Sequence, residues 1–365
     1  MPRSFLFASR PLANCGPETV LVIEYGQIED APGVFDPPQT VWGSQHPNTA
    51  STWGFASLPN TQVKNRTAAV FAGKVVGGSS AANGMFFDRG SRHDYDAWKL
   101  VASPEFDKSG IAWDWKGLFP FFRKVGGLRR SARICAPRSD RLQSVTFTEP
   151  SAGAAQQYGY TWDMSAYGGS TPIHSTMPPF LWGDHGILRG AWKDMGIRSP
   201  RECAGGDKEG VCWVPISEHP LTARRSHSGL GHYADVVGNG SRPNYDLLVG
   251  HQVTRILYPK GPKKGPPVVE ARALATNALL NITARAEVIL SAGAFHTPTI
   301  LMRSGIGPAP VIAAARVPLV LDLPGVGSNF QDHAGPAISW NCEPPPPHPS
   351  RTAEVEVMCL DKPGQ

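Results

Sequence analysis

The sequence lacks the long apolar runs and the one-sided charge that mark several large classes of protein. Hydrophobic residues make up 41% of its 365 residues, and no run approaches the roughly 20 apolar residues of a membrane-spanning helix. The 35 basic and 30 acidic residues nearly balance, giving a formal net charge of +5. We therefore expect neither a nucleic-acid partner nor a membrane span. The length is ample for a buried core, and the composition agrees with a soluble enzyme without requiring one.

Cysteine is scarce, and its spacing does not favour a metal site. The six cysteines stand at positions 15, 135, 203, 212, 342 and 359. Cys203 and Cys212 are close enough in sequence to pair, but we expect reduced thiols. The opening residues, MPRSFLFASRPLANCG, do not read as a signal peptide because Arg10 and Pro11 interrupt a short apolar run. Nothing assigns the compartment firmly, and a cytoplasmic location is favoured. The glycosylation sequons, which carry weight only in a secreted chain, begin at Asn65, Asn239 and Asn281.

A phosphate-binding glycine turn is also missing from the place where a dinucleotide fold needs it. Such a fold begins with a strand, a G-x-G-x-x-G turn and a helix, within a unit of about 30 residues. The residues before Thr19 contain no such pattern. Residues 229–234, GLGHYA, match the spacing but follow the polar run TARRSHS rather than a strand, so we reject them as a phosphate loop. We expect the chain to start inside the fold.

One short segment has the pattern of a buried parallel strand ending in an acid. Residues 19–24, TVLVIE, are apolar and β-branched up to Glu24. In dinucleotide-binding folds an acid at the tip of the second strand holds the adenosine ribose hydroxyls. The alternative is an acid that merely ends a strand in solvent.

The most informative segment is residues 73–98, GKVVGGSSAANGMFFDRGSRHDYDAW. Gly77 and Gly78 allow a close backbone approach, Ser79 adds a hydroxyl donor, and Asn83 with Gly84 allows a second tight turn. A loop that clamps a large planar or phosphorylated cofactor needs these features. Taken alone, the Gly-Gly-Ser-Ser run is more typical of an ordinary surface loop.

Three segments together resemble a known family. Residues 73–98 are similar to the first signature of the glucose–methanol–choline (GMC) oxidoreductases, which depend on FAD. Residues 293–307, GAFHTPTILMRSGIG, resemble the second signature, and residues 322–333, DLPGVGSNFQDH, supply a third similarity. The resemblance covers residues 18–124 and 144–335. It implies an α/β fold, with an FAD/NAD(P)-binding Rossmann-like domain and an α+β substrate domain, both incomplete in this chain.

The resemblance also implies which residues bind FAD. It assigns the ribose contact to Glu24 and a backbone contact with adenine to Val253. It places the loop of residues 77–86 against the flavin ring. The implied cofactor-binding residues are Glu24, Gly77, Gly78, Ser79, Asn83, Gly84, Phe86 and Val253. No metal ligand is implied.

The same comparison divides the chain into five parts. They are an FAD-binding part at 18–124, an insertion at 125–143, a partial substrate domain at 144–204, a continued FAD-binding part at 205–335 and an unstructured tail at 336–365. The alternative for residues 125–143 is a natural basic surface loop. Within them we expect helices near residues 94–98 and 113–124, with aromatic faces packed in the core, and strands within residues 247–258. We also expect a buried strand at 287–291 and a helix that begins at Thr297-Pro298.

The family resemblance implies an alcohol oxidase or dehydrogenase that transfers hydride from a CH–OH group to flavin. Secondary-metabolite or aromatic alcohols are the implied small-molecule substrates. None of the 11 histidines matches the family's catalytic base by motif, so no catalytic residue is assigned; His296 is interpreted as local packing. The alternatives are a hydroxynitrile-lyase-like relative and a non-catalytic, partner-binding remnant. The sequence does not indicate an oligomeric state, and it lacks the pattern of an NAD-dependent dehydrogenase.

Overall fold

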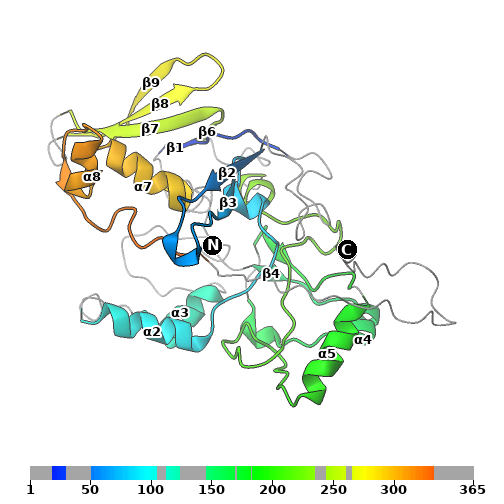
Figure 1. The fold of residues 1–365 in the computed structure, drawn as a ribbon. Coiled ribbons are helices and arrows are strands. Elements are labelled where there is room, and N and C mark those ends of the chain that lie inside the picture. The colour runs from blue at the N-terminus through cyan, green and yellow to red at the C-terminus, as the bar shows by residue number, and fades with distance from the viewer. Residues whose placement is uncertain are drawn as a thin grey trace, which may run out of the picture. The chain divides into compact units, whose positions relative to one another are not determined.

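The computed structural model describes residues 19–29, 51–104, 112–123, 145–168, 171–181, 183–234, 244–259 and 265–332 (Figure 1). The chain divides into two units, Met1–Val326 and Gly327–Gln365. In the second unit the described residues, 327–332, form no helix or strand. The predicted insertion at 125–143, the predicted tail and His333 lie outside the described residues.

The strand predicted at residues 19–24 is confirmed as β1 (Val20–Ile23). It pairs in parallel with β6 (Tyr245–Leu248), in a register that runs from Val20 opposite Tyr245 to Ile23 opposite Leu248. Its β-branched residues suit this pleated, partly buried position. Val22 is 1% exposed and packs in a small core with Val76 and Tyr245. Both strands therefore end at the same edge, where Glu24 follows β1.

A three-stranded antiparallel sheet follows β6 in sequence, as predicted for residues 247–258. Its strands lie in the order β7 (His251–Leu257), β8 (Val268–Ala273) and β9 (Leu279–Thr283). Helix α7 (Gly293–Arg303) runs beside β7 (Figure 1). Ser304 at the end of α7 accepts a hydrogen bond from the Ile256 amide, at 2.7 Å, and so ties the helix to the strand.

Two predictions in this region are wrong. Residues 287–291 form no strand, and none of them is fully buried, because no described segment pairs with them. Helix α7 begins at Gly293, before Thr297, and Pro298 lies inside it. The helix starts early because its first turn packs against aromatic rings: Phe295 stacks on Phe55 with centroids 4.4 Å apart. This contact offsets the one backbone hydrogen bond that Pro298 cannot donate.

The two helices predicted after the glycine-rich loop are confirmed as α2 (Arg92–Ala102) and α3 (Trp115–Phe122). Ser91 and Asp94 form a capping box that fixes the start of α2. Tyr95 contacts Trp115 and Phe122 across the helix pair, at centroid distances of 5.6 and 5.1 Å. The prediction of core packing is too broad, because Trp98 is 50% exposed.

The remaining elements are short. Strands β2 and β3 form an antiparallel hairpin, whereas β4 with β5 and β10 with β11 are parallel pairs. Phe147, Tyr160, Tyr167 and Met177 form the core of the part that contains α4 and α5. The bounds are β2 (Thr52–Ala56), β3 (Ala69–Gly73), β4 (Thr146–Phe147), α4 (Ala152–Tyr158), β5 (His174–Ser175), α5 (Asp184–Asp194), β10 (Ile306–Gly307), α8 (Ala309–Ala314) and β11 (Leu321–Asp322).

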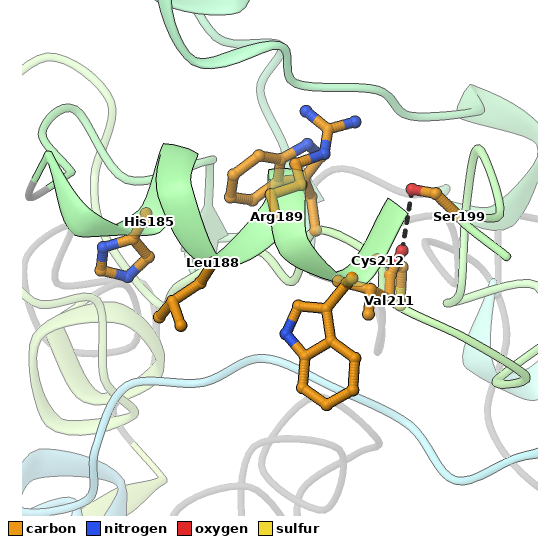
Figure 2. A pocket seen from close by; sticks show the side chains of 8 residues that line it. His185, Leu188, Arg189, Ser199, Val211 and Cys212 are labelled. Carbon is orange, nitrogen blue, oxygen red and sulfur yellow. Dashed lines mark hydrogen bonds between the residues drawn. The ribbon is translucent and has the colours of Figure 1, made fainter. Parts of the chain in front are cut away.

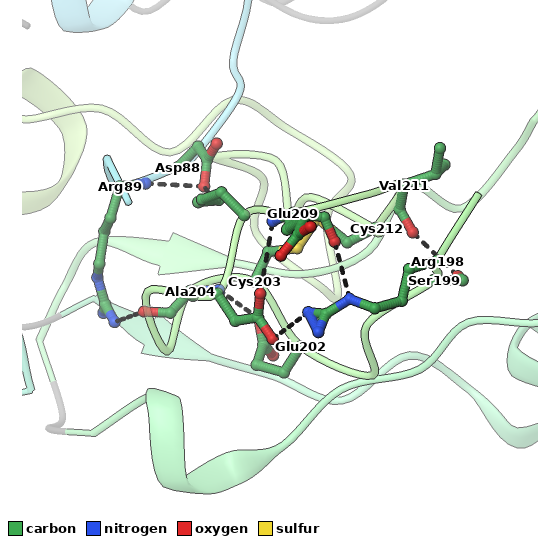
Figure 3. Close-up of a disulfide and its surroundings, with 12 residues drawn as sticks. Asp88, Arg89, Arg198, Ser199, Glu202, Cys203, Ala204, Glu209, Val211 and Cys212 are labelled. Atoms are coloured by element: carbon green, nitrogen blue, oxygen red, sulfur yellow. Dashed lines mark hydrogen bonds and ion pairs between the residues drawn. A yellow bond between two sulfur atoms is a disulfide. The ribbon is translucent and has the colours of Figure 1, made fainter. Parts of the chain in front are cut away.

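Cys203 and Cys212 form a disulfide, so the prediction of reduced thiols is wrong for this pair (Figure 3). The sequence separation of nine residues did not reveal that the intervening loop folds back. Val211 donates its amide hydrogen to the Arg198 carbonyl, and Gly206 donates to the Cys203 carbonyl. These backbone bonds bring the two Cα atoms to 6.2 Å, a spacing that a disulfide spans. The other four cysteines lie outside the described residues.

Candidate functional site: the carboxyl edge of β1

Glu24 lies directly after β1, at the carboxyl end of the parallel β1–β6 pair. Its amide donates to the Leu248 carbonyl, and its side-chain Oε1 accepts a hydrogen bond of 2.8 Å from the Gly26 amide. Burial raises the pKa of Glu24 from 4.5 to about 7, although hydrogen bonds from the Gly26 and Tyr25 amides oppose the rise. A buried carboxylate with remaining acceptor capacity is suited to bind hydroxyl donors.

Val253 reaches the same edge through the start of β7. His251 donates its amide hydrogen to the Glu24 carbonyl at 3.1 Å, and Gly250 donates to the Gly26 carbonyl. Strand β7 is the outer strand of its sheet, and its pairing with β8 shifts between Val253 and Arg255. Val253 pairs with Ala271 of β8 immediately before this shift, in a strand that begins beside Glu24.

The glycine-rich loop of residues 77–86 is joined to this edge by the strand-like segment before it. Gln27 forms a parallel bridge with Val75, and its carbonyl accepts from the Val76 amide at 3.0 Å. Thus Glu24, the start of β7 and the loop of residues 77–86, although far apart in sequence, are joined by backbone bonds at the residues that follow β1. In α/β folds, ligands bind beyond the carboxyl ends of parallel strands.

Backbone conformation and packing within the chain both require glycine at position 77. Gly77 has a φ of +106°, and a Cβ atom there would lie 2.8 Å from the Gly229 amide nitrogen and 2.9 Å from His227 Nδ1. Gly78, with a φ of +54°, begins a short 3-10 turn, Gly78–Ala81. Ser79 Oγ accepts from the Gly73 amide at 3.0 Å. The Ser79 oxygen thus helps to fold the loop, and this bond does not occupy the hydroxyl hydrogen that the sequence suggested as a donor to a ligand.

The second half of the loop is shaped by Asn83 and Met85. Asn83 Oδ1 accepts from the Met85 amide at 3.0 Å, and Met85 adopts a left-handed φ of +67°. Phe86 is 48% exposed. Among the described residues, a Cβ added at Gly84 would meet only the Phe86 ring, at an ordinary van der Waals distance of 3.7 Å. Packing against the described residues therefore does not explain the glycine at position 84.

Sequence reasoning missed the segment that holds this loop in place, residues 225–229. Arg225, only 1% exposed, donates to Asn83 Oδ1 at 2.7 Å and to the Asn83 carbonyl at 2.8 Å. The hydroxyl oxygens of Ser228 and Ser80 form a hydrogen bond at 2.8 Å. The run TARRSHS gave no signal of this role, because arginine, serine and histidine in a polar run ordinarily lie at the surface. The GLGHYA run that follows it forms a π-helical turn, Gly229–Tyr233.

Replacing Arg225 with lysine is expected to lower the free energy of unfolding by about 1–2 kcal/mol, because an ammonium group cannot reproduce the forked contact with Asn83. Arg66→Lys, at an exposed position, is the matched control and should change stability by less than about 0.5 kcal/mol. Urea denaturation of both variants measures the difference. Equal midpoints would contradict a role for Arg225 in holding the loop.

An open apolar pocket lies elsewhere, between α5 and the disulfide loop (Figure 2). Leu188, Trp192 and Trp213 line it, and Arg189 lies over the Trp213 ring at 5.0 Å. None of the predicted FAD-binding residues lines this pocket. It is therefore separate from the edge of β1.

The described residues contain no cluster of three or more metal-ligating side chains, and no described helix has the length and apolar character needed to cross a bilayer. His296 packs against the rings of Trp53 and Phe55, at centroid distances of 5.0 and 5.5 Å, as expected for local packing. Burial lowers its pKa.

The groups at the carboxyl edge of β1 are one acidic side chain, one strand edge and one glycine-rich turn. This combination fits the binding of a dinucleotide.

Comparison with solved structures supports this assignment of the fold. A fungal aryl-alcohol oxidase is 57% identical, with a TM-score of 0.77 over 88% of this chain and 49% of that chain. An FAD-dependent oxidoreductase from Chaetomium thermophilum is 32% identical, with a TM-score of 0.72 and the same coverage. The predicted α/β fold of the Rossmann-like, FAD-binding type is thus confirmed.

Comparison of sequences leads to the family. Dehydrogenase xptC of Emericella nidulans is 29% identical over 320 residues, which are 86% of this chain and 45% of that protein. The chain spans about half the length of such relatives. The model of the GMC oxidoreductase family matches residues 26–335. With this match over most of its length, the chain belongs to the GMC oxidoreductase family.

Proposed function

We propose that this chain binds FAD at the carboxyl edge of β1 and serves the oxidation of an alcohol. The observation that carries the proposal is the attachment of the glycine-rich loop, β7 and Glu24 to one strand end, through the bonds of Gln27 to Val76 and of Glu24 to His251. Membership of the GMC family supports it.

In this proposal each segment has a separate task. The Glu24 carboxylate accepts hydrogen bonds from ribose hydroxyls, and the Val253 backbone contacts the adenine. The loop that contains Gly77, Gly78, Ser79, Asn83, Gly84 and Phe86 lies against the flavin and is kept in shape by Arg225 and Ser228. When bound, FAD supplies a two-electron acceptor for hydride from the alcohol carbon. We assign no catalytic base among the described residues.

For the substrate we propose an aromatic primary alcohol. The support is the 57% identity to the fungal aryl-alcohol oxidase over 88% of this chain. The relatives compared above are named as oxidases, dehydrogenases or oxidoreductases, so we do not propose a lyase reaction.

The visible spectrum of the purified chain tests the proposal. After addition of excess FAD and removal of the unbound cofactor, we expect a retained flavin band that differs from that of free FAD. A folded chain that retains no flavin would contradict FAD binding. Loss of the retained band on anaerobic addition of benzyl alcohol, but not of ethanol, would support the substrate class, whereas loss with ethanol but not with benzyl alcohol would contradict it.

A further inference from the structure

Two of the three glycosylation sequons lie at exposed positions of the described structure. Asn65 begins Asn65-Arg66-Thr67, and Asn281 begins Asn281-Ile282-Thr283. Both asparagines are exposed, as are both threonines. The third sequon, at Asn239, lies outside the described residues.

Asn65 lies at the tip of the β2–β3 hairpin, where residues 56–69 are all exposed. Its amide donates to the Asn60 carbonyl at 2.9 Å, and its φ of +57° lies in the left-handed region that asparagine tolerates. The backbone of the turn is thus satisfied locally, and the side chain is exposed. A bulky group attached here would displace no described part of the core.

Asn281 lies on β9, the outer strand of its sheet. Its neighbour Ile282 pairs with the buried Val269, so the side chain of Asn281 points to the opposite face. Exposed edge strands are liable to pair with other chains, and a bulky polar group on such a strand prevents this pairing. A glycan at Asn281 would therefore protect the edge of the sheet.

The disulfide supplies the independent observation that gives these sequons weight. Cys203 is 1% exposed, whereas Cys212 is partly exposed and lines the open pocket (Figure 3). The loop that the disulfide closes has contacts of its own, among them the ion pair of Arg198 with Asp207 and that of Lys208 with Asp88. Structural disulfides form and persist in oxidising compartments. Exposed sequons in chains that pass through such a compartment are acceptors for N-linked glycans.

We propose that Asn65 and Asn281 carry N-linked glycans and that the chain folds in an oxidising compartment of the secretory route. This inference replaces the cytoplasmic location that the sequence favoured. It does not depend on the binding of FAD.

Mass spectrometry of the protein isolated from the cells that produce it tests this proposal. After release of glycans by an N-glycosidase in heavy-oxygen water, the peptides with Asn65 and Asn281 should contain labelled aspartate. Without reduction, the peptides of Cys203 and Cys212 should elute as one linked species. An unlabelled asparagine would overturn the proposal for that site, and reduced cysteines after rapid alkylation would overturn the assigned compartment.

Paired variants from a eukaryotic secretory host separate glycan loss from misfolding. On a denaturing gel, N-glycosidase treatment should increase the mobility of the parent protein by one step for each glycan removed. Thr67→Ala and Thr283→Ala should each abolish one of these steps. Thr67→Ser and Thr283→Ser preserve the sequon and should preserve the step. If an alanine variant keeps the step, or if its serine partner loses it, the assignment of that site is overturned.

Discussion

Replacement of Gly77 with alanine is expected to lower the free energy of unfolding by about 2–4 kcal/mol and to abolish FAD retention. The φ of +106° is unfavourable for any residue with a Cβ. The new Cβ would also lie 2.8 Å from the Gly229 amide nitrogen. Because that nitrogen is backbone in the segment that holds the loop, relief of the clash requires the loop and the segment to separate.

Gly84→Ala is the matched control within the same loop. Its Cβ would meet only the Phe86 ring at 3.7 Å, an ordinary van der Waals distance, so stability should change by less than about 0.5 kcal/mol. If Gly84→Ala is stable but loses FAD, the glycine at position 84 serves the ligand. Urea denaturation and flavin retention are measured for both variants. A Gly77→Ala variant as stable as the parent would contradict the packing described above.

The parts of the site that were predictable from sequence are those with short-range patterns. Strand β1 follows from a β-branched run that ends in Glu24, and the loop follows from glycines and small hydroxyl residues in a recognisable order. The adjacency of Glu24, the loop and Val253 was implied only by the family resemblance. It results from long-range backbone pairing, which no local pattern specifies.

The segment that holds the loop was not predictable because its contacts span the chain. Ser80 and Ser228 are 148 residues apart, and Asn83 and Arg225 are 142 apart. The polar run before GLGHYA was interpreted only as evidence against a phosphate loop. The disulfide was missed for a related reason: it depends on backbone bonds such as that from Val211 to Arg198. Composition does not report such bonds.

Replacement of Glu24 with glutamine is expected to stabilise the ligand-free chain near pH 8 while it weakens FAD binding. Burial raises the pKa of the folded carboxyl from 4.5 to about 7. The folded state therefore holds this proton more tightly than the unfolded state, and stability falls as pH rises between these two values. The full difference corresponds to about 3 kcal/mol, so Glu24→Gln should recover about 1–3 kcal/mol at pH 8 and much less at about pH 5.

FAD binding should have the opposite pH dependence. Ribose hydroxyls donate to the ionised carboxylate, so below about pH 7 the ligand must displace the Glu24 proton, and affinity should fall up to tenfold per pH unit. Glu24→Gln should bind FAD at least about tenfold more weakly at pH 8 and lose this pH dependence, because hydrogen bonds to a charged acceptor contribute about 1.5–3 kcal/mol.

Glu287→Gln, which removes an exposed carboxylate, is the control and should match the parent in both stability and FAD affinity. Flavin fluorescence titrations between about pH 5.5 and 8 measure the affinities. If the FAD affinity of the parent chain does not change with pH across this range, the ionised Glu24 carboxylate does not accept the ribose hydroxyls. With a raised pKa, binding to the ionised form would require loss of a proton below about pH 7, and the affinity would depend on pH.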